Sequence, residues 1–548
     1  MAKPADTMEK IVALCRRRGF IFGSSEIYGG IGGFWDYGPL GTELKRNIKE
    51  AWWLDMVRNP PTGPNGIEYQ MVGVDCSIIM NPKVWEASGH VGGFSDPMRD
   101  CKKCKLRYRA DFLSRVALFE FAQLPGPSTI HDVYRLLEGQ TPAISFLADA
   151  TPGMSVDEYA PFIKQAMGTK KVKSIPVRQI PVPGSPPVEV SNIYWDIAGR
   201  IYYMAQSFEK TCGNDLDSCP NCGGELTEPR EFNLMFETFV GASQDSTSKA
   251  YLRPETAQGI FTNFKNVMDS TRVKIPFGIA QIGKAFRNEI NPRNFTFRSR
   301  EFEQMEIEFF CHEDTSMMWY EFWRDTRIAW YESLGIKSNK LRPRQQDEDE
   351  LAHYSRACTD IEYLFPFSDE PQELEGVAHR GCYDLEAHGK ASKGKKNAFA
   401  VIDDATKERF VPHVIEPSAG VDRFLLATIT EAYTFDENRA SPEFMKFHPR
   451  LAPIKAAVFP LVAKDGMPEI ARPIFDEIKK HFACQYDAKQ SIGKRYARMD
   501  EAGTPFCFTI DGQSKEDGTV TVRNRDDASQ DRIDKSRCLE YLRDKLEL

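Results

Sequence analysis

The stretch Gly283–Phe310 holds residue types that can bind a phosphate group. It reads GKAFRNEINPRNFTFRSREFEQMEIEFF and sets Arg287, Arg293, Arg298 and Arg300 among several carboxylates. The planar guanidinium of arginine can donate two parallel hydrogen bonds to one phosphate. A merely solvated hairpin would carry mostly Lys and Glu, whereas this stretch has a single lysine near its start. The pattern favours nucleotide binding, and a solvated charged face is the alternative.

Two β-strands should position these side chains. Polar and apolar residues alternate over 285–290 and over 302–309, and the turn formers of 291–294 lie between them. Successive side chains of a strand point to opposite faces, so Arg287 and Glu289 would share a face of the first strand. We expect an antiparallel hairpin. One face of its second strand would be formed by Phe302, Gln304, Glu306 and Glu308.

A second candidate anion site follows the apolar segment 411–415. The run Glu416–Arg423 contains a proline and a glycine and leads into apolar residues 424–426. This order indicates a strand, a glycine break and a helix, with Arg423 in the first helical turn. Backbone N–H groups and the positive end of the helix dipole attract anions there. An ordinary helix N-terminus with a surface arginine is the alternative.

Composition limits the class of protein. The 548 residues suffice for roughly two to four domains, and no apolar run approaches the ~20 residues that cross a membrane. The first residues, MAKPADTMEK, lack the apolar segment of a secretory signal. The 13 cysteines include two C-x-x-C pairs, which fits a metal site in a reducing compartment better than a disulfide framework. We therefore expect a cytoplasmic protein that is not inserted in a membrane.

Charge and motifs limit how it can bind nucleotides. The net charge of −8 argues against a protein that coats nucleic acid without specificity, although it allows a local basic surface for one RNA. The chain lacks a G-x-x-x-x-G-K-[ST] phosphate loop. If ATP binds, arginines, metal ions and backbone groups must hold its phosphates.

The two candidate segments together resemble motifs 2 and 3 of the class II aminoacyl-tRNA synthetases. Three further runs narrow the resemblance to the glycyl-tRNA synthetases of the homodimeric type: LRPETAQG at 252–259, ASGHV at 87–91 and FNLMF at 232–236. The segment 373–385 is also similar to that family. The resemblance extends from about residue 19 to the C-terminus and is poor near 113–200. It is specific, because several separated motifs occur in the expected order.

The resemblance implies an α+β fold with a class II antiparallel-sheet catalytic core. The core would comprise residues 1–112 and 201–450, with motifs 2 and 3 in the second part, and residues 113–200 would form an insertion. Residues 451–548 would form an α/β anticodon-binding domain, in keeping with strand-like and helix-like segments that alternate there. Pro39 and the helix predicted over 42–57 correspond to motif 1, which implies a homodimer. A helix buried within its own domain would look the same.

The implied activity is that of a ligase in protein biosynthesis. It would form glycyl-adenylate from glycine and ATP, and then transfer glycine to the 3′ end of tRNA(Gly), with AMP and diphosphate as products. The second step would use the adenylate phosphate, because the sequence shows no obvious protein base.

Attack on the α-phosphate develops negative charge that fixed cations stabilise. The resemblance assigns Arg287 to the α-phosphate and the attacking carboxylate, and Arg423 to the γ-phosphate, as the two catalytic residues. Glu373 would contact ATP and Mg²⁺, an ion that prefers one or two carboxylates with phosphate oxygens; a surface acid is the alternative. The implied ATP contacts are Arg287, Asn288, Glu289, Phe297, Arg298, Ser299, Arg300, Glu301, Phe302, Glu373, Leu374, Gly420, Val421, Asp422 and Arg423.

Glycine offers a protein only an ammonium and a carboxylate group. Its site must pair the ammonium with acids and fill the space of a larger side chain, since a pocket rejects larger substrates by clash. Glu255, Glu306 and Glu416 are the candidates for the ammonium, and buried structural ion pairs are the alternative for each. The implied glycine contacts are Arg109, Glu255, Phe302, Glu303, Gln304, Met305, Glu306, Glu416, Pro417, Ser418, Ala419 and Gly420.

The two C-x-x-C pairs are candidates for a structural zinc site. Four thiolates satisfy tetrahedral zinc, and the run after Cys219 resembles a zinc knuckle. The pairs are separated by far more than the ~15–20 residues usual in a zinc ribbon, but members of the family insert sequence there. Cys212 is a possible substitute ligand, and buried thiols without a metal are the alternative. The predicted ligands are Cys101, Cys104, Cys219 and Cys222.

Basic residues of the last domain are candidates for contacts with tRNA. A solvated charged face is the alternative for them. The candidates are Lys494, Arg495, Arg498, Arg523, Arg525 and Arg532.

Two competing functions can be separated by particular residues. Another synthetase of the subclass would not be expected to carry Glu255 and the Glu416-x-Ser418 pattern. A non-enzymatic relative, such as a polymerase accessory subunit with a synthetase-like fold, usually lacks the ATP-binding arginines, which this chain retains as Arg287, Arg298 and Arg423.

Overall fold

The structure is a computed structural model. Its contacts divide the chain into two compact units, one formed by Met1–Val91 with Met235–Leu548 and the other by Gly92–Leu234. The second unit is wider than the insertion predicted at 113–200, because it includes both C-x-x-C pairs. The residues described are 4–110, 113–121, 144–149, 163–164, 173–174, 178–182, 185–190, 193–195, 201–207, 218–245, 247–347, 350–352, 355–392, 398–403, 406–439 and 441–546.

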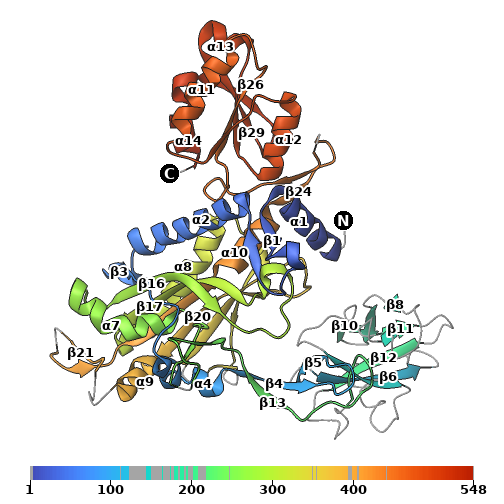
Figure 1. The fold of residues 1–548 in the computed structure, drawn as a ribbon, viewed down its shortest axis with the longest axis vertical. Coiled ribbons are helices and arrows are strands. Elements are labelled where there is room, and N and C mark those ends of the chain that lie inside the picture. Colours follow the sequence, from blue (N-terminus) through green and yellow to red (C-terminus); the bar gives the residue numbers. More distant parts are fainter. Residues whose placement is uncertain are drawn as a thin grey trace. The chain divides into compact units, whose positions relative to one another are not determined.

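A seven-stranded sheet forms the centre of the first unit (Figure 1). Its strands are β3 (Gln70–Gly73), β16 (Phe277–Phe286), β17 (Glu301–Cys311), β18 (Leu341–Gln345), β19 (Ala357–Tyr363), β20 (Gln372–Gly381) and β23 (His413–Gly420). They lie in the order β18-β19-β20-β23-β17-β16-β3, and all neighbours are antiparallel except β3 and β16. This mainly antiparallel sheet with packed helices has the composition expected of the predicted α+β fold.

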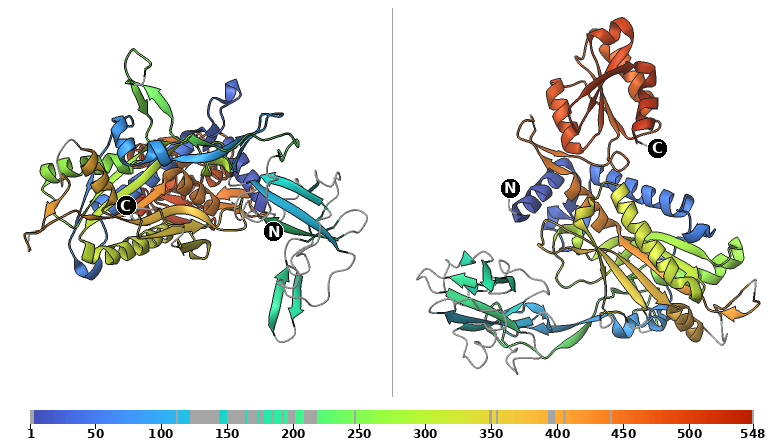
Figure 2. Two further views of the ribbon diagram at one scale, coloured as in Figure 1. Left: turned by 90° about the horizontal axis from the view of Figure 1, so that it is seen from below. Right: turned by 180° about the vertical axis from the view of Figure 1, so that it is seen from behind.

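Three helices pack on one face of this sheet, namely α2 (Pro39–Trp53), α8 (Ser316–Ser333) and α10 (Val421–Ala432). Seen from behind in Figure 2, α8 lies in front of the strands. Every second side chain of β17 reaches this core, including Met305, Ile307 and Phe309. The aromatic rings of α8 meet them, with Phe309 and Trp319 centroids 4.4 Å apart. The helices therefore fix the position of β17 from behind.

The opposite face of the sheet is covered at one end by α7 (Ala257–Thr271) and α9 (Tyr383–Ala391). Phe264 of α7 packs on Phe310 of β17 with ring centroids 4.5 Å apart. Further along the same face of β17 come Glu308, Glu306, Gln304 and Phe302. The predicted sharing of one face is confirmed, because Phe302, Gln304 and Glu306 line a cavity on this face, whereas the intervening Met305, Ile307 and Phe309 lie in the core beneath the helices.

The predicted hairpin is right in topology but wrong in its bounds. Strands β16 and β17 pair from Phe277↔Phe310 to Phe286↔Glu301, so residues 287–300 form the connection instead of 291–294. Arg287 and Glu289 consequently do not share the face of a strand. The connection turns through left-handed backbone at Asn294 and Phe295 (both φ 58°) and a 3₁₀ turn at Phe295–Phe297. Local hydrogen bonding of this longer loop outweighs the short alternation seen at 285–290.

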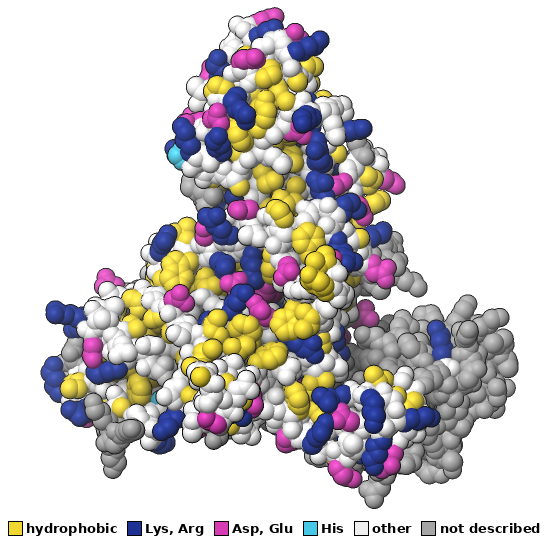
Figure 3. Space-filling model, in the orientation of Figure 1, with side chains coloured by type: hydrophobic (Ala, Val, Ile, Leu, Met, Phe, Trp, Pro, Cys, Tyr) yellow, Lys and Arg dark blue, Asp and Glu magenta, His cyan; other side chains and the backbone are white. Residues whose placement is uncertain are grey.

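The C-terminal part of the first unit holds a second sheet in the order β27-β26-β28-β29-β30, with β27 and β26 parallel and β29 and β30 antiparallel to their neighbours. Side chains alternate along β26, so that Val458 packs with α11 and α14 whereas Phe459 packs with α12. The labelled helices α11, α14 and α12 lie around this sheet in Figure 1. On the surface of this C-terminal part that Figure 3 shows, basic and acidic side chains are interspersed. The elements are β26 (Ala456–Pro460), α11 (Met467–Ile478), β27 (Cys484–Tyr486), α12 (Ile492–Ala502), β28 (Phe506–Ile510), α13 (Gly512–Asp517), β29 (Thr519–Asn524), β30 (Gln530–Asp534) and α14 (Cys538–Leu546).

The second unit contains a three-stranded sheet of β4 (Ser95–Asp100), β5 (Arg107–Arg109) and β13 (Arg230–Asn233) in the order β13-β4-β5. A five-stranded sheet is built from β6 (Leu113–Phe121), β7 (Ile144–Asp149), β8 (Lys173–Ser174), β11 (Ile193–Trp195) and β12 (Ile201–Ser207). In neither unit is a described helix long and apolar enough to cross a lipid bilayer.

Candidate active site

A cavity of about 500 Å³ opens on the face of the central sheet that α7 and α9 leave uncovered. Strand β17 contributes Phe302, Gln304 and Glu306 to its lining, and the loop of residues 287–300 closes one side. The sequence-predicted residues that line it are Glu255, Arg287, Glu289, Phe297, Arg298, Ser299, Phe302, Gln304, Glu306, Glu373, Leu374, Glu416, Ser418, Gly420, Asp422 and Arg423. The fold thus brings together residues from four separate stretches of sequence.

One end of the cavity is cationic. The Nε of Arg287 donates to the carbonyl of Pro254 at 3.1 Å, and its guanidinium lies 5.4 Å from the ring centroid of Phe302. Arg423, in the first turn of α10 as predicted, lies 4.6 Å from the ring centroid of Phe297. Aromatic faces attract guanidinium groups, so the rings hold both arginines at the cavity wall.

Glu373 stands beside this cationic end. Its carboxylate is 3.2 Å from Nη1 of Arg423, which also donates to the Glu373 carbonyl at 3.0 Å. The charge of Arg423 lowers the pKa of Glu373, so the carboxylate is ionised at neutral pH and available to a cation.

Four residues predicted to contact ATP are not part of the described lining of the cavity, namely Asn288, Arg300, Glu301 and Val421. Arg300 donates from Nε to the carbonyl of Glu289 at 2.8 Å and from Nη1 to the carbonyl of Gly32 at 2.7 Å. Glu301 is ion-paired with Lys284. Arg300 therefore shapes the loop, and its side chain does not face the cavity.

The other end of the cavity is acidic. Glu306 accepts hydrogen bonds from the hydroxyls of Thr256 and Ser418, the latter at 2.7 Å, and Gln304 donates to the Ser418 hydroxyl at 3.3 Å. Burial raises the pKa of Glu306 to about 8, and the nearby charge of Glu416 adds to the rise. This end therefore has a deficit of positive charge that a ligand cation would relieve.

A hydrogen-bonded network surrounds the acids. Arg380 of β20 binds Glu416 at 2.9 Å and Asp384 of α9 through two bonds of 2.8 and 2.9 Å. Gln258 donates to Glu255 at 2.9 Å and to Asp384 at 3.1 Å. Buried carboxylates need such partners, so the network fixes Glu255 and Glu416 in place.

Glu255 also lies 3.3 Å from Nε2 of His90. Burial alone would raise the pKa of Glu255, but the neighbouring His90 lowers it well below its ordinary value. The three acids of this end therefore differ, because Glu255 has a basic neighbour that Glu306 lacks among the described residues.

Sequence reasoning missed Thr256, Gln258, Arg380, Asp384 and His90. Thr256, Gln258 and His90 fall within runs that carried the family resemblance, and that was their one available signal. Arg380 and Asp384 also fall within a family-like segment, 373–385, but their separation of four residues is a spacing common on any surface helix. The contact of Arg380 with Glu416 depends on the pairing of β20 with β23, which no local pattern predicts.

Several residues predicted to contact glycine or ATP point away from the cavity. Alternation along β17 and β23 turns the side chains of Glu303, Met305 and Ala419 to the helical face, and Pro417 and Val421 are likewise absent from the described lining. Predicting contacts for whole runs ignored the period of the strand. Their side chains are excluded from the site, and a ligand would meet these residues through the main chain.

Glu303 and Asp422 belong to an ion-pair cluster behind the sheet. Lys45 of α2 lies 2.8 Å from each of them, and Lys49 lies 3.0 Å from Glu303. Asp422 also accepts from the Glu303 backbone at 2.7 Å and from the hydroxyl of Tyr37. The cluster ties α2 to the strand and helix that carry Phe302 and Arg423.

Arg109, predicted to contact glycine, lies in β5 of the second unit. There it pairs with Asp96 at 3.0 Å. It is not among the residues that line the cavity of the first unit.

The four cysteines predicted to bind metal converge in the second unit. The sulfurs of Cys101 and Cys222 are 3.6 Å apart, as are those of Cys104 and Cys219, and all four lie within 4.8 Å of one another. Tetrahedral zinc with Zn–S bonds of ~2.3 Å places sulfurs ~3.8 Å apart, so the geometry fits that ion. A Cβ at Gly224 would come within 3.3 Å of the Cys222 sulfur, which explains the glycine. Cys212 lies outside the described residues.

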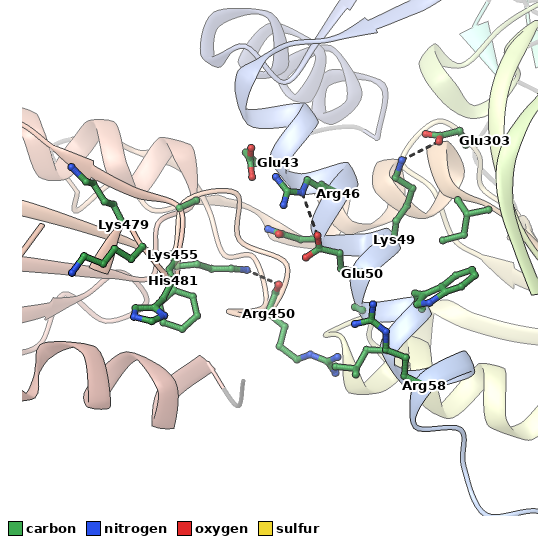
Figure 4. A pocket seen from close by; sticks show the side chains of 18 residues that line it. Glu43, Arg46, Lys49, Glu50, Arg58, Glu303, Arg450, Lys455, Lys479 and His481 are labelled. Atoms are coloured by element: carbon green, nitrogen blue, oxygen red, sulfur yellow. Dashed lines mark hydrogen bonds and ion pairs between the residues drawn. The ribbon is translucent and has the colours of Figure 1, made fainter. Parts of the chain in front are cut away.

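A larger cavity of about 960 Å³ lies between α2 and the end of α11 (Figure 4). Its side chains are mainly charged, with Lys49 paired to Glu303 at 3.0 Å and Arg46 to Glu50 at 3.2 Å. Of the predicted site residues it contains Glu303 and no other among those described. Size alone therefore does not identify the active site.

The prediction of tRNA contacts is wrong for three of the C-terminal arginines. Arg523 binds Asp500 through bonds of 2.8 and 2.9 Å, and both side chains are buried. Arg495 donates to the carbonyls of Pro460 and Leu461, and Arg525 to those of Gly503 and Phe447. The hydrogen-bond donors of these three arginines are thus occupied by carbonyl and carboxylate oxygens of the chain itself. Lys494 and Arg532 remain exposed.

Comparison with known proteins bears on the whole chain. The model of the tRNA synthetase class II core domain (G, H, P, S and T) matches residues 236–433, and that of the anticodon binding domain matches residues 455–545. The chain is 49% identical to the glycine–tRNA ligase of Rhodopirellula baltica, over 96% of this chain and 97% of that protein. It is 44% identical to the glycine–tRNA ligases of Ruminiclostridium cellulolyticum and Geobacillus kaustophilus, over 99% of each chain. Both the class II core and the anticodon-binding domain predicted from the sequence are confirmed.

Proposed function

The chain belongs to the glycine–tRNA ligase family, and from that premise we propose that the cavity on β17 and β23 is where it activates glycine with ATP. The reaction forms glycyl-adenylate and diphosphate, and glycine then passes to the 3′ end of tRNA(Gly). One observation carries the assignment of the site: a single cavity has three arginines at one end and a cluster of three acids at the other. Such a polarity suits phosphates and an ammonium group at the same time.

The cationic end is assigned to ATP. Arg287 contacts the α-phosphate and the glycine carboxylate, where negative charge develops during in-line attack. Arg423 and Arg298 hold the outer phosphates, and Phe302 stacks on the adenine. Preorganised cations act without reorganisation during the reaction, and the rings beside Arg287 and Arg423 supply that preorganisation.

Glu373 is the candidate ligand for Mg²⁺. The ionised carboxylate beside Arg423 and the phosphate oxygens together form the donor set that this ion prefers. The bound ion supplies further neutralisation of phosphate charge.

The acidic end is assigned to glycine. Glu306 and Glu416 bind the ammonium group, Glu255 adds negative charge, and Ser418 fills space beside the α-carbon. A methyl group would have to enter a wall formed by the paired strands, and dense packing resists this. In the transfer step no described side chain is assigned as base, and the adenylate phosphate receives the proton of the ribose hydroxyl.

The direct test is exchange of labelled diphosphate into ATP, measured with each amino acid in turn. We expect exchange with glycine and at least about 100-fold less with alanine. Exchange supported by another amino acid but not by glycine would refute the assignment of the acidic end. No exchange with any amino acid would refute the assignment of the whole cavity.

A structural zinc ion is proposed at the four cysteines. Support comes from the sulfur separations, and from the N–H of Cys104, which donates to the Cys101 sulfur at 3.3 Å. The ion would join two segments more than 100 residues apart. We expect about one zinc per chain and its loss in Cys219→Ser, with Cys382→Ser as the control cysteine outside the cluster. Substoichiometric zinc in the wild-type chain would argue against the site.

A cytoplasmic homodimer is proposed as the working form. Motif 1 supports it, together with the exposed apolar residues Ile27, Tyr28 and Ile31 near α2 in sequence, which a second copy would cover. The cysteine usage supports a reducing compartment. Sedimentation equilibrium tests the dimer, and a monomer at micromolar concentration would refute it.

A further inference from the structure

Glu308 is a buried acid that the site described above does not use. It lies on the same face of β17 as Glu306, one step deeper toward α7, and its exposure is 0%. The register that pairs Glu306 with Ser418 and Phe309 with Ile415 sets Glu308 opposite Glu416 of β23. These side chains form a cluster of three acids, Glu306, Glu308 and Glu416, in which each offers an oxygen within 4.8 Å of the others.

The three acids differ in the hydrogen bonds that they receive. Glu306 accepts from two hydroxyls and Glu416 accepts from Arg380. Within the described part of the chain, no donor reaches either carboxylate oxygen of Glu308. An ionised carboxylate can only accept hydrogen bonds, and leaving a buried charge without a partner is strongly unfavourable.

The surrounding charges do not compensate for three ionised acids. Arg380 is shared between Glu416 and Asp384, so one cation serves several carboxylates. Adjacent buried carboxylates do not all ionise. The titratable groups that face this cluster are Glu306, Glu416 and Glu255, Arg380 and Asp384, His90 and His388, and Arg253.

We propose that Glu308 is a positioning residue of the glycine site, which stays protonated and donates a hydrogen bond to the carboxylate of Glu416. This inference rests on the proposed function, in which Glu416 binds the glycine ammonium. Of the three acids, Glu308 is the one that accepts no hydrogen bond from a described residue. If it keeps its proton, it can donate that proton in a hydrogen bond to Glu416. The same bond fixes one oxygen of Glu416 and leaves the other for Arg380 and the ligand.

The consequence concerns the affinity for glycine. If Glu308 is neutral, at most two negative charges, those of Glu306 and Glu416, surround the single positive charge of the glycine ammonium. Without the donor, Glu416 would keep its bond to Arg380 alone, and its second oxygen would no longer be held in place for the ligand. Glu308 does not touch the substrate, so its effect should fall on the KM for glycine and leave the KM for ATP unchanged.

Two substitutions of similar size separate this role from packing. Glu308→Gln keeps an N–H donor aimed at Glu416, and we expect a KM for glycine within about twofold of wild type. Glu308→Leu removes the donor, and we expect that KM to rise about 10- to 100-fold, the usual effect of losing a hydrogen bond to a charged group. Phe309→Leu, on the opposite face of β17, is the control for disturbance of the strand.

An infrared measurement tests the proton itself. With glycine bound, the wild-type chain should show the carbonyl band of a protonated carboxyl group that shifts in D₂O, and Glu308→Gln should lack it. This variant keeps the size of the side chain, so the test stands even if Glu308→Leu fails to fold. Absence of the band in the wild type, or an equal rise in KM for Gln and Leu, would overturn the proposal.

Glu416→Gln separates the placement of glycine from the role of Glu308. If it leaves the KM for glycine unchanged, the placement of glycine is wrong. If it raises that KM while both Glu308 variants match wild type, the placement stands and the role of Glu308 falls.

Discussion

The catalytic core and the C-terminal domain use arginine in opposite ways. In the core, Arg287 and Arg423 stand at the wall of a cavity against aromatic rings. In the C-terminal domain, Arg495, Arg523 and Arg525 are buried and hold carbonyl and carboxylate oxygens of the domain itself. Under the proposed function, Arg287 and Arg423 serve a ligand, whereas the three buried arginines of the C-terminal domain serve the fold. What separates the two uses is the presence of a cavity, which a list of arginines does not show.

The largest effect is expected at Arg287. Arg287→Ala should lower the rate of glycine-dependent diphosphate exchange about 10²- to 10³-fold, because a fixed donor to developing charge is lost. The unfolding transition should stay where it is, since the side chain stands at a cavity wall. Arg293→Ala, in the same loop but exposed and outside the cavity lining, is the matched control. Equal exchange rates in Arg287→Ala and Arg293→Ala would show that Arg287 does not act on a ligand, and the proposed difference between the two regions would be wrong.

Arg523 should behave in the reverse manner. Arg523→Ala leaves Asp500 buried with its remaining partner, Arg439, at 3.5 Å, and we expect the C-terminal domain to lose about 3 kcal/mol of unfolding free energy. Diphosphate exchange needs no tRNA and should be unchanged at low temperature. Denaturant unfolding followed with a probe in the C-terminal domain measures the loss. An intact unfolding transition with weakened tRNA binding would restore Arg523 as an RNA contact.

Arginines at the cavity wall were easier to predict from the sequence than arginines buried in the C-terminal domain. Glu306, Ser418 and Arg423 line the cavity, and the family motifs pointed to all three; strand alternation agreed for Glu306, and the expected helix start agreed for Arg423. The buried roles of Arg523 and Arg525 were not identified, because their partners lie on other elements and depend on tertiary packing. The alternation of strands and helices was enough to predict the last domain. It was not enough to distinguish the buried arginines of that domain from its exposed basic residues.

Contacts within the core site show a similar limit. Whole runs such as 302–306 and 416–420 were predicted to touch glycine, although a strand presents every second side chain to one face. Applying the period of two to those runs would have removed Glu303, Met305 and Ala419 from the sequence alone. The pairing of Arg380 with Glu416 could not be obtained in this way, because it depends on which strands are neighbours.

The buried acids of the two regions should also differ in how they make stability depend on pH. Asp500 has the cation Arg523, whereas burial raises the pKa of Glu306 from 4.5 to about 8. A group with a raised pKa in the folded state contributes stability that is present below pH 4.5 and is lost as the pH rises through about 8. The thermal midpoint of the glycine-free chain should therefore fall over this window, and less so in Glu306→Gln.

Glycine binding should show the opposite trend. Ionised Glu306 is the form that attracts the ammonium, so the KM for glycine should fall as the pH rises toward about 8. Glu303→Gln, on the other face of β17, is the control. A KM that does not change with pH in this range, or the same profile in Glu306→Gln, would show that Glu306 does not control binding.

The smallest effects are expected at the exposed cations of the C-terminal domain. Arg532 pairs with Asp511 at the surface and Lys494 is exposed, and surface ion pairs contribute only about 0–1 kcal/mol to stability. Arg532→Ala and Lys494→Ala should leave the unfolding transition unchanged, yet raise the KM for tRNA about two- to fivefold, with a weaker dependence on salt, if each meets one phosphate. Aminoacylation measured at two salt concentrations, with diphosphate exchange as the tRNA-independent control, tests this. If neither variant changes the KM for tRNA, the basic residues of this domain serve its fold and solubility, and the tRNA surface must be sought on other residues.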